Sequence, residues 1–236
     1  MIYLLAIFAF CISLIIRWLI SKQHVERGNQ RQETIPSVSE TFDETAELGN
    51  SDTHDFTPEA DTPEFKTVAA ELETLSGNKP KPLGFIKGGL CFAFTATQAD
   101  TVITQRHDEF IRLGCYVFRC KQGFGIDGLP DLVGVLPTTD RDVVLEAVCT
   151  NGANYDIYTP QIITWLRELE QIQPFILTGA GQDYLEGKFT TPVKDPENLA
   201  KKVYEFCPDV VDQGTETVEA LANELASERK LFLWWD

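Results

Sequence analysis

The sequence predicts an α+β domain with a single mixed sheet, preceded by one N-terminal transmembrane helix and a disordered acidic tether. From about residue 63 onward, apolar residues recur with helical and strand periods. The two kinds of element alternate irregularly, which favours a mixed sheet over a doubly wound parallel one. The apolar run over residues 2–20 predicts the membrane helix. The expected boundaries are therefore 1–20 for the anchor, 21–62 for the tether and 63–236 for the domain.

The N-terminal run is apolar apart from Ser13 and Arg17. At about 1.5 Å per residue it nearly crosses a hydrocarbon core of roughly 30 Å. A cleaved signal peptide fits less well, because no Lys or Arg precedes the run and no small-x-small cleavage site follows it. The flanking cations all come late in the run or after it, at Arg17, Lys22, Arg27 and Arg31. Because positive flanks stay cytoplasmic, we expect a single-pass anchor with the C-terminal domain in the cytoplasm.

The tether, residues 21–62, is rich in Gln, Glu, Asp, Ser and Thr and poor in aliphatic residues. Such a segment cannot bury enough apolar surface to offset its conformational entropy. Acidic residues without any Lys or Arg run from Glu33 to Glu64, and their repulsion should extend the segment. A net charge of −16 gives no electrostatic reason to expect nucleic acid as a partner. The six cysteines form no CxxC pair and no zinc spacing, which favours buried reduced thiols over a zinc site. No cofactor is expected.

Periodicity and end signals place the elements of the domain. Helices are expected at about 65–75, 97–113, 139–150, 159–173, 196–206 and 215–225, and strands near 90–94, 115–120, 132–136, 175–177, 184–189 and 231–235. Thr97 and Thr139, each followed three residues later by an acid, are expected to start helices, as are Asp195 and Thr215. The glycines at 179–181 predict a hairpin loop. Those at 123–128 match GxGxxG spacing, but no helix follows them.

Two motifs are not required by generic core packing. One is Asn151-Gly152-Ala153-Asn154-Tyr155-Asp156-Ile157; the other, which we name the C-terminal signature, is Cys207-Pro208-Asp209-Val210-Val211-Asp212-Gln213-Gly214-Thr215 together with Trp234-Trp235-Asp236. They resemble the bacterial family known as domain of unknown function 4253, whose members typically end in a Cys-Pro-Asp-Val/Ile-Val-Asp-Gln-Gly-Thr element, a helix and Trp-Trp-Asp. The resemblance is clear over 130–236 and implies no catalytic role. Residues 63–129 are either an extension of the same sheet or a poorly matched front half of the fold.

Asp209, Asp212 and Gln213 are the first candidate site. Neighbouring carboxylates in a loop between two helices could bind a hard cation or act as an acid/base pair. They could equally accept backbone N–H bonds in the turn or favour the positive end of the next helix. The second interpretation predicts that these residues stabilise the turn and the helix start and neither bind a ligand nor catalyse a reaction.

The other candidates follow a turn or end the chain. Asn154, Tyr155 and Asp156 lie between a turn and a helix, where polar side chains often meet a ligand. Asp183 and Glu186 could join them from a strand, although solvated strand positions would explain them too. Along the last strand, alternation should bury one of Trp234 and Trp235 and expose the other beside Asp236 as part of a recognition patch.

Two functions fit these patterns. The first is a non-enzymatic protein-interaction module, tethered to the membrane through residues 2–20 and binding a protein partner near it. The alternative is a hydrolase-like or metal-binding enzyme that uses the Asp209/Asp212 region. No Ser-His-Asp order is readable, because His24 and His54 fall in the tether and His107 is alone on a helix.

Overall fold

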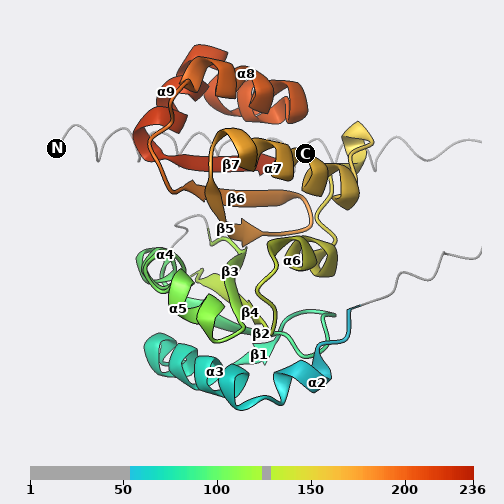
Figure 1. Cartoon of the computed structure of the whole chain (residues 1–236), viewed down its shortest axis with the longest axis vertical. Helices are drawn as coiled ribbons and strands as arrows, with labels where there is room; N and C mark the ends of the chain where they lie inside the picture. Colours follow the sequence, from blue (N-terminus) through green and yellow to red (C-terminus); the bar gives the residue numbers. More distant parts are fainter. Residues whose placement is uncertain (1–53, 124–128) are drawn as a thin grey trace, which may run out of the picture. The chain divides into compact units, whose positions relative to one another are not determined.

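Seven strands form one mixed sheet in the part of the chain that the structure describes (Figure 1). The structure is a computed structural model and describes residues 54–123 and 129–236. In chain order the strands are β1 Lys81–Pro82, β2 Leu90–Phe94, β3 Tyr116–Lys121, β4 Asp131–Leu136, β5 Phe175–Ala180, β6 Tyr184–Phe189 and β7 Lys230–Trp234. They are arranged in the order β1-β2-β4-β3-β5-β6-β7. Only β3 and β5 pair in parallel, and the other neighbours are antiparallel, which confirms the expected mixed sheet.

The helices are α2 Thr57–Ala60, α3 Pro63–Ser76, α4 Ala96–Gln105, α5 His107–Arg112, α6 Arg141–Val148, α7 Thr159–Ile172, α8 Pro196–Phe206 and α9 Val218–Glu228. A 3₁₀ turn, η1, spans Ala153–Tyr155, and a π-helix, η2, spans Val210–Thr215. None of the helices in the described residues is long and apolar enough to span a membrane. The predicted anchor, residues 2–20, and the tether up to residue 53 lie outside the described residues.

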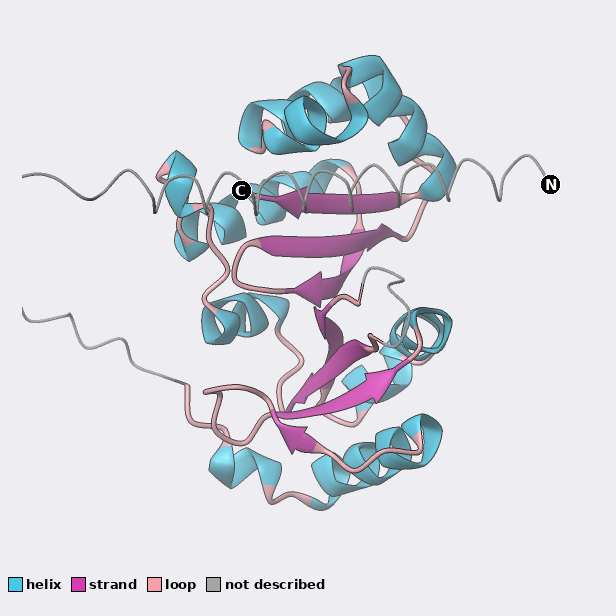
Figure 2. Ribbon diagram, turned by 180° about the vertical axis from the view of Figure 1, so that it is seen from behind, coloured by secondary structure: helices cyan, strands magenta, loops and turns pink. Residues whose placement is uncertain are grey.

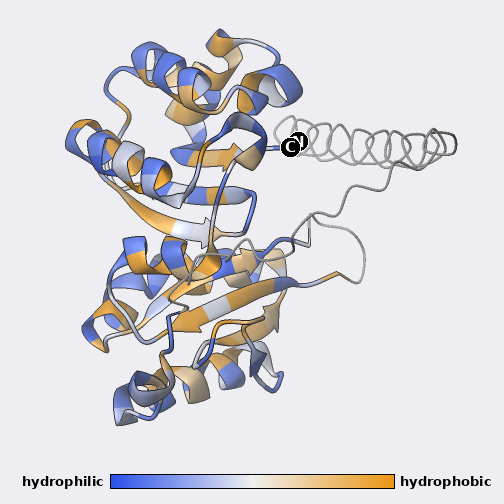
Figure 3. Ribbon diagram, turned by 90° about the vertical axis from the view of Figure 1, so that its right-hand side faces the viewer, coloured by the Kyte–Doolittle hydropathy of each residue, from blue (hydrophilic) through white to orange (hydrophobic). Residues whose placement is uncertain are grey.

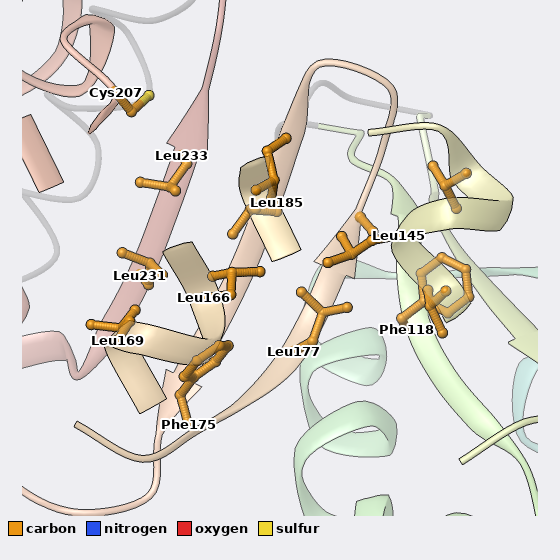
Figure 4. Packing of buried hydrophobic residues seen from close by; sticks show 14 of the residues in the cluster. Phe118, Leu145, Leu166, Leu169, Phe175, Leu177, Leu185, Cys207, Leu231 and Leu233 are labelled. Atoms are coloured by element: carbon orange, nitrogen blue, oxygen red, sulfur yellow. The ribbon is translucent and has the colours of Figure 1, made fainter. Parts of the chain in front are cut away.

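Two apolar cores lie on opposite faces of the sheet. Helices α3, α4 and α5 cover one face of β2, β4 and β3, around residues such as Leu72, Phe92 and Phe110. Helices α6 to α9 contribute to the second core, which extends along the other face from β3 to β7. Figure 4 shows Leu145, Leu166 and Leu185 among the side chains of this second core. In Figure 3 the strands are largely hydrophobic, whereas the described helices carry both hydrophilic and hydrophobic residues.

Local sequence explains where several elements begin and end. The side chain of Asp195 accepts a hydrogen bond from the backbone of Asn198 and starts α8 as expected. Gly77 ends α3 in the left-handed conformation, with φ 67°. A hairpin connects β5 and β6, as expected, but its loop is residues 181–183, because Gly179 and Ala180 still belong to β5 and pair with Glu186 and Leu185 of β6.

Three expected helix starts are wrong. The first N-cap is Thr95, which forms a capping box with Gln98, and the helix expected at 97–113 breaks at Arg106 into α4 and α5. Helix α6 begins after Asp140 instead of Thr139. The final helix begins after Thr217 instead of Thr215, because residues 210–215 form η2. In each case another Thr or Asp nearby is the one whose side chain meets the free backbone N–H groups.

The folded part begins before Pro63, which corrects the expected end of the tether. Helix α2 lies within that segment, and Phe56 is buried in the second core. The backbone N–H of Phe56 donates to the carbonyl of Lys87, and the side chain of Asp55 pairs with the Lys87 ammonium. These contacts hold residues 55 and 56 against the connection between β1 and β2. The apolar content of residues 54–62 was too low to predict this.

Candidate functional site

The first part of the C-terminal signature folds into the π-helix η2 directly after α8. Val210 and Val211 are buried in the second core. The backbone N–H of Glu216 donates to the carbonyl of Val211, the five-residue spacing of a π-helix. Glu216 then takes a positive φ of 68° and ends the element. Isolated π turns are rare and frequently lie at functional sites.

Asp209, at the start of η2, connects three separate segments. Its side chain is buried, with 2% of the residue exposed. One carboxylate oxygen, Oδ1, accepts hydrogen bonds from the hydroxyl of Tyr155 at 2.5 Å and from Nε2 of Gln213 at 2.9 Å. The other, Oδ2, accepts from the backbone N–H of Asp236 at 2.9 Å. Hydrogen bonds from these donors compensate the lost hydration of the buried carboxylate.

Tyr155 comes from η1 and remains 39% exposed although its hydroxyl is held by Asp209. That hydrogen bond raises the pKa of Tyr155 to about 12, because ionisation would place a phenolate against a carboxylate and lose the shared proton. Tyr155 is therefore a neutral donor with a fixed ring orientation. Its neighbours Asn154 and Asp156 are exposed, and Asp156 has a positive φ of 56° that ends the turn.

The terminal tryptophans occupy different environments. Trp235 is buried, lies edge-on to Phe206 with ring centroids 5.9 Å apart, and packs directly over Gly152. Trp234 is partly buried and packs against Gly214 of η2. The thiol of Cys207 donates to the carbonyl of Trp234 at 2.9 Å. The end of β7 is thus tied to both motifs.

Asp212 and Asp183 lie outside the Asp209 cluster. Asp212 is exposed and accepts a hydrogen bond from the hydroxyl of Tyr204 at 3.0 Å, which raises the pKa of Tyr204. The backbone carbonyl of Asp183 accepts a hydrogen bond from the N–H of Trp235, and Asp183 is an exposed residue. The structure therefore brings together Tyr155, Asp209, Gln213 and the backbone of Asp236. The ten candidate residues of the sequence analysis do not all lie at one site.

Comparison with known protein families gives a match to the C-terminal part of the chain. Residues 132–236 match the model of a domain of unknown function, DUF4253. This confirms the resemblance carried by the two motifs. No curated protein and no solved structure matches the chain.

The DUF4253 match begins inside β4, so β2 and β3 lie before it. Strand β3 nevertheless lies between β4 and β5 in the sheet. Residues before the match therefore supply the central strand of the sheet, and the strands of segment 63–129 belong to that same sheet.

A second polar cluster, centred on Arg119 of β3, was not predicted. Its guanidinium donates to Asp131 at 2.8 Å, to Glu186 at 2.5 Å and to Asp100 at 2.5 Å. Gln122 also donates to Glu186, and the backbone N–H of Gly123 donates to Asp131. Arg119, Asp131 and Glu186 are all buried. Burial raises the pKa of Glu186, and the neighbouring Arg119 only partly offsets this.

One signal in the sequence could have revealed this cluster. Arg119 shares a strand face with Val117, and a cation at a core-facing position needs buried carboxylates as partners. Glu186, expected beside Asp183 or at a solvated strand position, is buried instead. Its partner comes from β3, 67 residues earlier in the chain.

The described residues contain no group of three or more His, Cys, Asp or Glu side chains arranged to hold a metal ion. Two surface hollows in this part of the chain lie elsewhere, one at the C-terminal end of α3 and one beside residues 84–90. The geometry around Asp209 can fix the η1 turn, η2 and the end of β7 relative to one another. It presents Tyr155 at the surface in a single orientation.

Proposed function

We propose that the chain is a non-enzymatic protein-interaction module that an N-terminal helix holds at the cytoplasmic face of a membrane. The observation that carries this proposal is the set of three donors on Asp209. The most deeply buried carboxylate of the C-terminal signature is used to fix a surface. That surface, the η1 turn with Tyr155, is preorganised, and preorganisation lowers the entropic cost of binding a partner.

The composition of this surface suggests the kind of partner. Tyr155 is 39% and Tyr158 51% exposed, and Asp156 lies between them. Tyrosine is enriched in protein interfaces because a rigid ring offers large contact area with few rotatable bonds. The acid favours a partner segment that carries Lys or Arg, which can also lie over a tyrosine ring.

Membrane anchoring rests on the sequence. The apolar run at 2–20 and the cations that follow it support a single-pass helix with the domain in the cytoplasm, in a bacterial inner membrane. A flexible tether of about 40 residues has a root-mean-square span of roughly 35 Å. Such a tether raises the local concentration of the domain around partners near the membrane.

The alternative function, a hydrolase-like or metal-binding enzyme using Asp209 and Asp212, has less support. The two carboxylates accept hydrogen bonds from different tyrosines, Asp209 from Tyr155 and Asp212 from Tyr204. Each is thus engaged locally, and no specific observation favours a shared reaction.

A photo-crosslinking residue at position 158 tests the interaction surface in cells. We expect a protein adduct at position 158 in the full chain and none when the same residue replaces Lys66, an exposed position on α3. The adduct should weaken when Asp209→Ala releases Tyr155. Equal adducts at positions 158 and 66, or none at either, would contradict the proposed surface.

A reporter that is active only in the cytosol, fused after Asp236, tests the topology. We expect signal from this fusion. Signal from a periplasm-specific reporter at the same place would overturn the orientation while leaving the interaction surface untouched.

A further inference from the structure

The shortest strand pairing in the described sheet joins β3 to β5. The pairs β2–β4, β3–β4, β5–β6 and β6–β7 each contain five paired residues, whereas β3 and β5 pair only at Arg119 and Gly179. The register shifts between Arg119 and Lys121 where β3 meets β4, and between Leu177 and Gly179 where β5 meets β6. Such shifts bend a strand and interrupt its hydrogen bonds. The β3–β5 contact thus divides the sheet into a front half-sheet, β1-β2-β4-β3, and a back half-sheet, β5-β6-β7 (Figure 2).

On one face of the sheet, apolar packing crosses this contact. Tyr116 and Phe118 of β3, Leu177 of β5 and Leu145 of α6 all belong to the second core. The hydroxyl of Tyr116 also donates to the backbone carbonyl of Leu177 at 3.2 Å. The two half-sheets therefore share a continuous buried layer on this face, and separating it would expose much apolar surface to water.

The opposite face carries polar contacts across the same junction. Among the described residues, the core beneath α3, α4 and α5 includes no side chain from β5, β6 or β7. The Arg119 guanidinium donates to Glu186 at 2.5 Å, and Gln122 donates to Glu186 as well. At the surface, the Lys230 ammonium is 3.9 Å from Asp100 of α4. The two faces of the junction thus differ in what holds the half-sheets together.

Glu186 is the carboxylate that connects Arg119 to the back half-sheet. The other two carboxylates on the guanidinium are Asp131 of β4 and Asp100 of α4, which lie on the front side of the junction. The hydroxyl of Tyr184 adds a hydrogen bond to the carbonyl of Arg119 at 3.3 Å. If Glu186 moved away, Arg119 would keep two carboxylates, so no buried cation would be left without compensation.

We propose that the β3–β5 contact is a hinge: the two half-sheets rotate relative to each other about the second core, and the hydrogen bond from Arg119 to Glu186 holds them closed. Opening on the side of Arg119 hydrates charged groups and exposes little apolar surface, so it costs less than separating the second core. A hinge needs only a few residues that absorb the change in backbone angles. Gly179 and the two register shifts supply them at the contact itself.

The hinge is independent of the proposed interaction surface. Tyr155, Asp209 and the end of β7 are joined to one another by hydrogen bonds on the back side of the junction, so the rotation leaves them unchanged. A partner that contacted both half-sheets would bind one arrangement better and shift the populations toward it.

Distances between two spin labels on the full chain, measured by pulsed electron spin resonance, test the hinge. One label replaces Gln105 of α4 and the other replaces Ala226 of α9, both exposed. Genetically encoded labels leave the native cysteines unmodified. Opening should lengthen this distance, because Lys230, which follows α9, lies beside Asp100 of α4 when the hinge is closed.

Variants of the Glu186 contact should change the two populations. In Glu186→Ala, the ratio of molecules with the longer distance to molecules with the closed distance should rise at least about tenfold over the wild type, because a hydrogen bond between charged groups contributes at least that factor. Glu186→Gln keeps an oxygen that accepts from Arg119 and should open less. Gln122→Ala, which leaves Arg119 and Glu186 paired, should shift the ratio in the same direction by less. Glu205→Ala, at an exposed position on α8, should match the wild type.

A second pair of labels separates hinge opening from unfolding. Gln105 and Ala70 of α3 are both exposed and lie on the front side of the junction, so their distance should be the same in every variant. A Glu186→Ala distribution identical to that of the wild type would overturn the proposal, as would a Glu186→Gln variant that opens as far as Glu186→Ala. Lengthening that also appeared between positions 105 and 70 would do the same, because the front half-sheet would then be unfolding. None of these results would affect crosslinking at position 158.

Discussion

Two buried charges connect distant segments of this domain. Asp209 accepts hydrogen bonds from η1, η2 and the end of β7, and Arg119 joins β3 to α4, β4 and β6. Breaking a buried ion pair by removing one partner typically costs about 3–5 kcal/mol, because the remaining charge is left without compensation. Arg119 is therefore expected to tolerate few substitutions even without contacting a ligand.

Glu186 provides a pH test of the Arg119 cluster. Its pKa is raised in the folded state, mainly by burial. The folded chain thus holds a proton that the unfolded chain has already released. Unfolding free energy should fall as pH rises from about 4.3, the ordinary glutamate value, through the raised pKa. In Glu186→Gln this decrease should be absent. The free energy of unfolding of the variant should therefore increase relative to that of the wild type as pH rises.

Denaturant unfolding of both proteins at several pH values measures this difference. Glu205→Gln, at an exposed position on α8, is the control and should follow the wild type at every pH. A Glu186→Gln variant that instead loses stability relative to wild type as pH rises would show that the ion pair with Arg119 dominates over burial.

At the level of elements, the two motifs are in contact at Gly152, which leaves space for the indole ring of Trp235. A Cβ atom added to Gly152 would lie 2.5 Å from Cγ of Trp235, far inside van der Waals contact. Trp235 also packs against Phe206 of α8, so it has little room to move. The turn before η1 therefore depends on glycine at this position for packing, since its φ of −119° is open to any residue.

Gly152→Ala should destabilise the domain by about 1–3 kcal/mol, the usual cost of overpacking a core. Ala153→Ser, at the exposed neighbouring position, should stay within about 0.5 kcal/mol of the wild type. Midpoints of urea unfolding compare the two. Equal midpoints would mean that Trp235 is not fixed against the turn.

The type of an element, helix or strand, was predictable where the local signals were unambiguous. The residues at which helices begin were often not predictable. The Asp195-Pro196-Glu197 start of α8 has no competing cap nearby, and it was predicted correctly. Near α4 and α9, neighbouring threonines offer the same chemistry, and tertiary packing decides between them. Helix η2 could not be predicted, because a π turn depends on how Val210 and Val211 reach the core from the end of α8.

At the scale of the whole molecule, the family match covers only part of the seven-stranded sheet of the described residues. It begins at residue 132, whereas β3 at 116–121 pairs with both β4 and β5. A chain that starts at residue 132 would leave both of these strands without their central neighbour. Arg119 and Gln122, the hydrogen-bond partners of Glu186, would also be missing.

Fragments test this dependence directly. Residues 54–236 should unfold cooperatively, whereas residues 132–236 should lack a cooperative transition and be digested rapidly by protease, because unpaired strand edges and one side of the core are exposed. Thermal unfolding followed by circular dichroism distinguishes the two. A cooperative transition in the shorter fragment would show that the front half is an independent addition.

The candidate site was only partly predictable for a similar reason. The two motifs pointed to Tyr155 and Asp209, but the hydrogen bond between them joins residues 54 positions apart in the chain. Asp209 and Asp212 look equivalent in the sequence, yet one is buried and the other exposed, because η2 turns them in different directions. Residue types suggested candidates, whereas their separate roles required the tertiary fold.

We propose that Asp209 fixes the surface around Tyr155 and does not hold a cation. Melting curves of the full chain, with and without Mg²⁺ or Ca²⁺, test it for the wild type, Asp209→Asn, Asp209→Ala and the exposed control Asp212→Asn. Asp209→Ala should lose about 2–4 kcal/mol because it leaves buried donors without an acceptor, and Asp209→Asn should lose less because it retains one acceptor oxygen. Asp212→Asn should stay within about 0.5 kcal/mol, and neither cation should shift any curve. A wild-type melting temperature that rises with Mg²⁺ or Ca²⁺, together with an Asp209→Asn variant that is more stable than wild type and no longer responds, would contradict the claim.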